Sequence, residues 1–351
     1  MTLRREAVGV VNFVDQYCGY YEELFSKDVR SYENLKYLHL GLISEIPRKT
    51  LPAIARAVGL EDGQELHHLV ANSPWDVTEF RQKRLALIKK VLKGRTIILC
   101  IDETGDRKKG KTTDYVTRQY IGNLGKIDNG IVSVNAYGVM DGITFPLLFK
   151  VYKPKGTLKT GDKYKTKPEL AVEIIEELKQ EGFKFSVVLA DSLYGESSDF
   201  IAGLEKLKLK YVLAIRSNHA VWMSADQRII YGSWSEFDRV FSNEEIEVRY
   251  IREIIYGVRR RVRFYQITTD KKLLPQDTTW FVMTNMEGYI KKQVGNIYGL
   301  RTWVEYGFKQ IKNELGWADY RLTDYRDIER WWEIVSSAYL MVSLQAGIFK
   351  N

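Results

Sequence analysis

The 351-residue chain is poor in cysteine, histidine and proline, and each scarcity excludes a class of protein. Two cysteines, Cys18 and Cys100, exclude a disulfide framework, and the lack of a CxxC pattern excludes a common structural zinc site. Four scattered histidines exclude a histidine-rich metal centre, and seven prolines exclude a proline-rich linker architecture. The sequence has no run of 18 apolar residues and no secretory signal, so we expect a cytoplasmic protein without a membrane anchor.

Positive charge, in contrast, is abundant and clustered. The chain carries 53 Lys and Arg residues against 45 Asp and Glu residues, a formal net charge of +8. Seven lysines and one acid lie in residues 150–167, six arginines and one acid in 249–263, and six basic residues and one acid in 107–126. A solvated loop would explain any one cluster. Three clusters together favour a polyanionic partner such as nucleic acid.

The first part of the chain, residues 1–93, is predicted to form a helical DNA-binding domain. A short helix is expected over 50–59 and, after a glycine-containing turn, a second helix over 64–72. This order is typical of a helix-turn-helix, although small helical hairpins that bind nothing share it. We expect His67 and His68, in the second helix, to contact DNA or solvent.

The pattern changes at Gly94, where short apolar runs begin to predict strands. Strands are expected at 96–101, 130–138, 144–152, 185–190 and 211–215, and a helix is expected at 168–181. Hairpin-linked strands followed by a β-α-β unit predict an α/β fold: a mixed, ribonuclease H-like sheet with helices on both faces.

Four segments follow from these changes of pattern. The helical domain over 1–93 precedes the first part of the α/β core over 94–216. Residues 217–288 alternate between apolar and polar side chains, which predicts a small antiparallel, β-rich insertion. The helical pattern of 289–351 returns the chain to the core.

Two aspartates directly follow buried strands of the predicted sheet. Asp102 comes after the run IILCI, and Asp191 comes after VVLA. Ligands of open α/β sheets collect at the carboxyl ends of strands, and a carboxylate there is costly unless it is paired or bound to metal. Alternatively, each aspartate simply caps the loop or helix that follows it.

A helix predicted after residue 290 supplies a third acid. At about 100° per residue, one face of this helix carries five polar residues: Tyr298, Arg301, Glu305, Lys309 and Lys312. The apolar residues between them face the sheet. A surface salt bridge between Glu305 and Lys309 is the simplest interpretation of the stripe. An acid flanked by phosphate-binding groups is also what a metal-dependent enzyme acting on DNA requires.

The residue types indicate the chemistry of such a site. Three carboxylates without a Cys or His cluster favour Mg²⁺ or Mn²⁺, and two such ions can activate a water or 3′-hydroxyl for attack on a phosphodiester. Arg301, Lys309 and Lys312 would then hold neighbouring phosphates, and Tyr298 would pack on a base or sugar.

The segment after Asp102 adds further candidates. Glu103 and Asp106 are either additional residues of the site or the start of a solvated loop. Four basic residues follow closely, and we expect them to contact phosphate near the site: Arg107, Lys108, Lys109 and Lys111.

The polar stripe resembles a known signature. Its spacing is Y-x2-R-x3-E-x6-K, formed by Tyr298, Arg301, Glu305 and Lys312. This resembles the Y-R-E-K signature of bacterial insertion-sequence transposases of the DDE superfamily. The motifs IDETGD at Asp102 and ADSLYG at Asp191 resemble the surroundings of the first two acids of that family. The segment from SEIPRKTLPAIARAVGL to HHLVANSPWD resembles the leader of one of its branches, so the resemblance covers nearly the whole chain.

The resemblance implies a cut-and-paste transposase, in which Asp102, Asp191 and Glu305 hold two Mg²⁺ or Mn²⁺ ions and a dimer grips two double-stranded DNA ends. Relatives with a β-rich insertion often cut the second strand through a DNA hairpin, aided by a tryptophan that receives a flipped base. Trp222 and Trp234 are possible counterparts, but we expect both in the hydrophobic core. A nuclease without strand transfer and an inert DNA-binding derivative are the alternatives.

Overall fold

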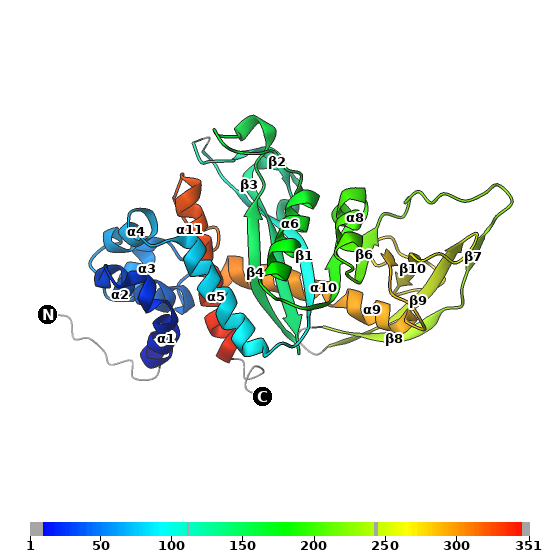
Figure 1. Cartoon of the computed structure of the whole chain (residues 1–351), viewed down its shortest axis with the longest axis horizontal. Helices are drawn as coiled ribbons and strands as arrows, with labels where there is room; N and C mark the ends of the chain where they lie inside the picture. Colours follow the sequence, from blue (N-terminus) through cyan, green and yellow to red (C-terminus); the bar gives the residue numbers. More distant parts are fainter. Residues whose placement is uncertain (1–9, 111, 242–244, 346–351) are drawn as a thin grey trace.

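The computed structural model describes residues 10–110, 112–241 and 245–345 (Figure 1). Its N-terminal region is helical and contains α1 (Val10–Cys18), α2 (Val29–Ile43), α3 (Leu51–Ala57), α4 (Gln64–Ala71) and α5 (Val77–Leu92). A 3-10 helix, η1 (Gly19–Phe25), follows α1. Acidic caps fix two of the starts. Asp28 accepts a hydrogen bond from the backbone N–H of Ser31 at the start of α2, and Asp76 caps α5 in the same way.

The central sheet is mixed, as the sequence predicts. Its first strands are β1 (Ile97–Arg107), β2 (Thr117–Ile121), β3 (Lys126–Met140), β4 (Ile143–Val151), β5 (Phe185–Ala190) and β6 (Tyr211–Ile215). The strand β1 lies between β3, which is antiparallel to it, and β5, which is parallel to it. The long strand β3 pairs with both β2 and β4, and β6 continues the parallel part beyond β5. The molecule is therefore a mixed α/β protein.

The β-rich insertion extends this sheet and does not form a separate layer. Its strands are β7 (Ile229–Tyr231), β8 (Ser235–Val240), β9 (Ile246–Tyr256), β10 (Arg263–Thr268) and β11 (Trp280–Thr284). All of their pairings are antiparallel, and β11 pairs with β6. The described chain therefore contains one continuous 11-stranded sheet that reaches from β2 at one edge to β7 at the other.

Helices cover both faces of the sheet (Figure 1). The covering helices are α6 (Lys167–Gln180), α8 (Ser198–Lys206), α9 (Lys291–Gly299) and α10 (Arg301–Lys309). Side chains alternate along a strand, so Leu99 of β1 joins the core under α6 and α8, while Cys100 joins the core of the other face with Val304 of α10. Asp102 lies two residues after Cys100 and therefore faces α10.

Two details differ from the sequence prediction. The strand β1 does not end before Asp102 but continues to Arg107, because its antiparallel partner β3 keeps pairing with it as far as Gly130. The helix predicted through 298–312 is interrupted at Leu300 and passes into a π-helical turn over Gln310–Glu314. A spacing of 100° per residue therefore does not hold from one end of the polar stripe to the other.

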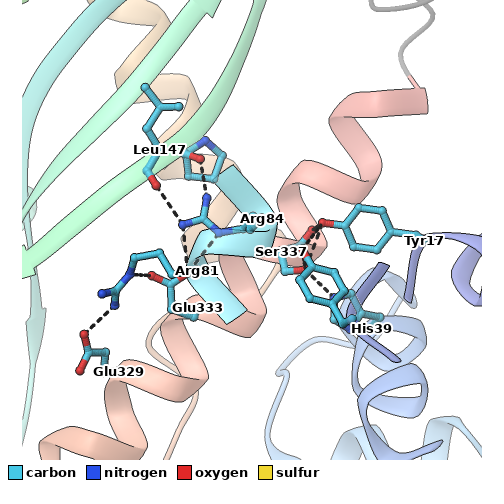
Figure 2. Close-up of polar contacts among 10 residues, drawn as sticks. Tyr17, His39, Arg81, Arg84, Leu147, Glu329, Glu333 and Ser337 are labelled. Carbon is cyan, nitrogen blue, oxygen red and sulfur yellow. Dashed lines mark hydrogen bonds and ion pairs between the residues drawn. The ribbon is translucent and has the colours of Figure 1, made fainter. Parts of the chain in front are cut away.

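The last helix, α11 (Tyr325–Gln345), joins the N-terminal helices to the sheet (Figure 2). Glu333 of α11 is fully buried and accepts hydrogen bonds from Arg81 and Arg84 of α5; Arg84 also donates to backbone carbonyls of β4. One turn later, Ser337 contacts the buried His39 and Tyr17. These networks connect three parts of the chain. Within the described residues, neither α11 nor another helix is long and apolar enough to cross a membrane.

Candidate active site

The first two acids lie at the same level on neighbouring strands. Ile101 of β1 pairs with Ala190 of β5, and Asp102 and Asp191 are the next residues of the two strands. Asp102 is 7% exposed, and its Oδ1 accepts a hydrogen bond of 2.8 Å from the backbone N–H of Glu103. Because neighbouring strands lie about 4.8 Å apart, this register brings the two aspartates to one edge of the sheet.

Asp191 has a local role in this state of the molecule as well. Its Oδ1 accepts a hydrogen bond of 2.9 Å from the N–H of Leu193 and so caps α7 (Ser192–Gly195), as the simpler sequence interpretation expects. The end of α7 packs tightly on β6. A Cβ atom on Gly195 would lie 1.9 Å from the carbonyl oxygen of Ala214, so only glycine allows this approach.

The third acid, Glu305, is joined to Asp102 through Arg301. The Nη2 atom of Arg301 lies 3.1 Å from Oδ2 of Asp102, and its Nη1 atom lies 3.2 Å from Oε1 of Glu305. The Glu305 side chain is 58% exposed, whereas those of Arg301 and Asp102 are largely buried. The Arg301 Nε is buried and has no hydrogen-bond partner among the described residues. One guanidinium thus bridges two of the three predicted acids.

Burial dominates the electrostatics of this edge. It raises the pKa of Asp102 to about 7; Arg301 opposes the rise, while Asp191 and Glu305 add to it. The pKa of Arg301 is raised above its ordinary value, because Asp102, Tyr298, Asp191 and Glu305 together outweigh the cost of burying the guanidinium. The three acids and the arginine therefore form one electrostatically coupled group.

The donor set of this group suits a hard divalent cation. Its three acids offer carboxylate oxygens without histidine or cysteine, which is the chemistry that Mg²⁺ and Mn²⁺ prefer. In the part of the chain that the structure describes, no three acidic, histidine or cysteine side chains converge closely enough to hold a metal ion. Arg301 lies between Asp102 and Glu305.

Other residues of the polar stripe have different surroundings. Tyr298 is buried, and its ring meets Trp280 of β11 edge-on at 5.6 Å, so in this state it is not available for stacking on a base. The Nζ atom of Lys312 lies 3.0 Å from Oδ1 of the buried Asp106 and also donates to the carbonyl of Gly105. Lys309 is exposed.

The acids beside Asp102 belong to β1 and not to a solvated loop. Asp106 points to the face of α10, where it binds Lys312. Glu103 points to the opposite face, where its Oε2 lies 2.6 Å from Nζ of Lys167 at the start of α6. Sequence reasoning missed Lys167 as a partner of this edge. Its place in a lysine cluster gave no signal, because the contact depends on the packing of α6.

The basic loop after β1 is only partly exposed. Arg107 forms an exposed ion pair with Asp128 at 3.0 Å. Lys108 lies 3.4 Å from the ring centroid of Tyr320, and burial lowers its pKa to about 8. Lys109 is exposed, and Lys111 lies outside the described residues.

The two candidate tryptophans are not core residues, so that expectation is wrong. Trp222 is 88% exposed, in the segment between β6 and β7. Trp234 is partly buried beneath Arg252, whose guanidinium lies 4.5 Å from the ring centroid. Both belong to the insertion, where the exposed strand β7 leaves little core to bury large rings.

Comparison with known proteins identifies the family of this chain. Residues 20–232, which include Asp102 and Asp191, match the family described as DDE superfamily endonuclease. The chain therefore belongs to the DDE superfamily of endonucleases, among the insertion-sequence transposases. It is 59% identical over 330 residues to the probable transposase for insertion sequence element IS701 of Microchaete diplosiphon, an alignment that covers 94% of this chain and 87% of the relative. This family implies a ribonuclease H-like fold, DNA binding and nuclease activity.

Proposed function

We propose that the chain is a cut-and-paste transposase that cleaves double-stranded DNA at the ends of its insertion sequence and joins them to a target. One observation carries the proposal: Asp102 and Asp191 lie side by side at one edge of the sheet, and Arg301 bridges Asp102 to Glu305, in a chain of the DDE superfamily.

Asp102, Asp191 and Glu305 would hold Mg²⁺ or Mn²⁺, two ions in each site. When bound, such ions activate a water or 3′-hydroxyl and stabilise the leaving oxygen of the phosphodiester. Arg301 would exchange its two carboxylate partners for a DNA phosphate, which accepts the same bidentate hydrogen bonds. Lys309 is exposed on the same helix and would bind a neighbouring phosphate without giving up a partner in the fold.

The N-terminal helices would recognise the DNA ends. The helices α3 and α4 are joined by a short turn, and His67 and His68 lie exposed on α4. We expect a homodimer on DNA, because joining two ends to one target requires two active sites. The basic loop at Arg107 and Lys109 would contact the DNA backbone beside the acids.

The test is cleavage of a labelled duplex that carries one end of the insertion sequence. Asp191→Asn and Glu305→Gln are expected to bind this duplex like the wild type and to leave it uncut in Mg²⁺ or Mn²⁺. Asp141→Asn is the matched control, because Asp141 is an exposed turn acid that pairs with Arg95 at 3.2 Å. Cutting by either active-site variant would overturn the assignment.

Two further assays separate the alternatives. Pre-cut ends incubated with a plasmid target are expected to give joined products; cleavage without joining would indicate a nuclease of the same fold. End binding without any cutting by the wild type would indicate an inert derivative. A denaturing gel of cut ends tests the hairpin route, for which the exposed Trp222 is the better placed of the two tryptophans.

A further inference from the structure

A groove in the β-rich insertion lies apart from the acidic edge. It has a volume of about 880 Å³ and runs between the β7–β8 connection, the β9–β10 turn and the start of α9. Its basic lining residues are Arg259, Arg260, Arg261, Arg263, Lys291 and Lys292. Its acidic lining residues are Glu253 and Glu287. Six cations against two carboxylates leave the groove strongly positive.

The ion pairs and hydrogen bonds of the groove cancel only part of this charge: Arg261 pairs with Glu205, which lies outside the lining, at 3.5 Å. Arg259 and Arg263 both bind Glu253, each with two hydrogen bonds of 2.9–3.1 Å, so two cations share one carboxylate. Arg260 and Lys291 donate to backbone carbonyls, which carry no net charge. The groove is therefore built to hold several arginines in place while their positive charge stays available to an anion.

Two exposed aromatic rings accompany these cations. Tyr289, a lining residue, is fully exposed, and Trp222 is 88% exposed. Arg260 binds the backbone carbonyl of Trp222, which holds that residue against the arginine turn. Aromatic rings beside a positively charged groove are the usual means of holding unpaired nucleotides.

We propose that this groove binds single-stranded DNA, with phosphates on the arginines and bases stacked on Tyr289 and Trp222. The role of this strand rests on the proposed function, because cleavage at the acidic edge frees the end of a strand. The helix α9 connects the groove to that edge, since it begins at the groove and is followed by Arg301. This nine-residue helix spans only about 14 Å, a distance of a few nucleotides. The groove retains the unpaired end of the strand that is not joined to the target.

The experiment measures binding of a fluorescent oligothymidine of about 12 nucleotides to the full chain in EDTA, so that no cutting interferes. Tyr289→Ala combined with Trp222→Ala is expected to weaken binding about 10-fold or more, while the affinity for duplex ends changes less than about 2-fold. The logarithm of the binding constant falls linearly with the logarithm of the salt concentration. Arg260→Gln and Arg261→Gln should each make the slope of this line shallower by about 0.7. The rings are exposed, so the variants are expected to fold.

Tyr120→Ala is the matched control, because Tyr120 is an exposed ring on β2 at the opposite edge of the sheet. Single-strand binding that is unchanged in the double variant, or lowered equally by Tyr120→Ala, would overturn the proposal. An equal loss of duplex binding would do so too, because the groove would then be a duplex surface. If the wild type never cuts DNA but the double variant still loses single-strand binding, the proposed function is wrong, while the proposal that the groove binds single-stranded DNA is supported.

Discussion

Two clusters of arginine and carboxylate in this molecule teach different lessons about buried charge. In the cluster between α5 and α11, both oxygens of Glu333 are used, by Arg81 at 2.5 Å and by Arg84 at 2.9 Å and 3.1 Å. In the cluster at the acidic edge, one guanidinium is divided between Asp102 and Glu305. The first has two arginines for its buried acid, and the second has one arginine among three acids.

The pKa values of the two buried acids differ in direction for this reason. Burial raises the pKa of both carboxyls, but at Glu333 the two arginines outweigh it and the pKa is lowered. At Asp102 the single arginine does not outweigh burial, and Asp191 and Glu305 oppose it, so the pKa rises to about 7. The cluster at Glu333 is complete within the protein. The cluster at Asp102 lacks positive charge, which an incoming cation would supply.

Removing the acid of the complete cluster should have the largest effect on stability. Glu333→Gln leaves two buried guanidiniums without their shared carboxylate, and we expect it to lower the free energy of unfolding by about 3–5 kcal/mol. Urea unfolding followed by tryptophan fluorescence measures this. Glu329→Gln is the control, because Glu329 is partly exposed and pairs with Arg81 at the outer side of the cluster, so it should cost less than about 1 kcal/mol. If both variants lost the same free energy of unfolding, the difference we expect between the buried Glu333 and the partly exposed Glu329 would be contradicted.

The incomplete cluster should respond to pH. In metal-free buffer, the unfolded Asp102 loses its proton near pH 4, but the native one keeps it until about pH 7. Its stabilising contribution is therefore present at acid pH and is lost as pH rises through this window, by up to about 4 kcal/mol. Asp102→Asn should remove that dependence, as measured by unfolding at several pH values between 4 and 7. A variant with the wild-type pH profile would contradict the raised pKa.

His39, beside the complete cluster, should have the opposite pH dependence. Burial lowers its pKa to about 4, so between pH 6.5 and 4 the unfolded chain takes up a proton that the native chain does not. Stability is lost as pH falls through this window, by up to about 3 kcal/mol. His39→Gln should abolish this loss, whereas the exposed His67→Gln should not. In the wild type, His39 and Asp102 change the free energy of unfolding in opposite directions as pH changes. Asp102→Asn should therefore reveal the pH dependence due to His39, and His39→Gln should reveal the pH dependence due to Asp102.

The smallest effect on stability is expected at Glu305. Its side chain is 58% exposed and makes one ion pair within its own helix, so Glu305→Gln should change the free energy of unfolding by less than about 1 kcal/mol. Urea unfolding and end cleavage measured on the same preparation compare stability with activity. Loss of cutting with retained stability would place Glu305 in the reaction; loss of both would make it a structural acid.

The sheet could be predicted from local sequence where its strands are buried on both faces. The strands predicted at 185–190 and 211–215 coincide with β5 and β6, because their apolar residues are consecutive over 187–190 and 211–215. The extension of β1 through Glu103 to Arg107 could not be predicted in this way. That segment is polar, and only its pairing with β3, some 25 residues later, keeps it in the sheet.

The residue types of the candidate site could be proposed from the sequence, but their contacts could not. Strand ends and helical spacing indicated Asp102, Asp191 and Glu305, whose part in catalysis stays a prediction. Spacing could not show that Arg301 lies between Asp102 and Glu305, since this depends on the face of α10 that packs on the sheet. The exposure of Trp222 could not be predicted from the sequence either, because an aromatic residue in an alternating segment normally packs in the hydrophobic core.

The contacts of α11 have a consequence for where DNA would be cut. Glu333 and Ser337, one turn apart, hold α5, α2 and α1 against the helix, while Arg84 holds β4 (Figure 2). Only residues 93–96, all of them described, lie between α5 and β1, the strand that carries Asp102. In the proposed reaction the folded chain would then act as a ruler: the number of base pairs between the recognised sequence and the severed bond would be fixed by the dimensions of the protein.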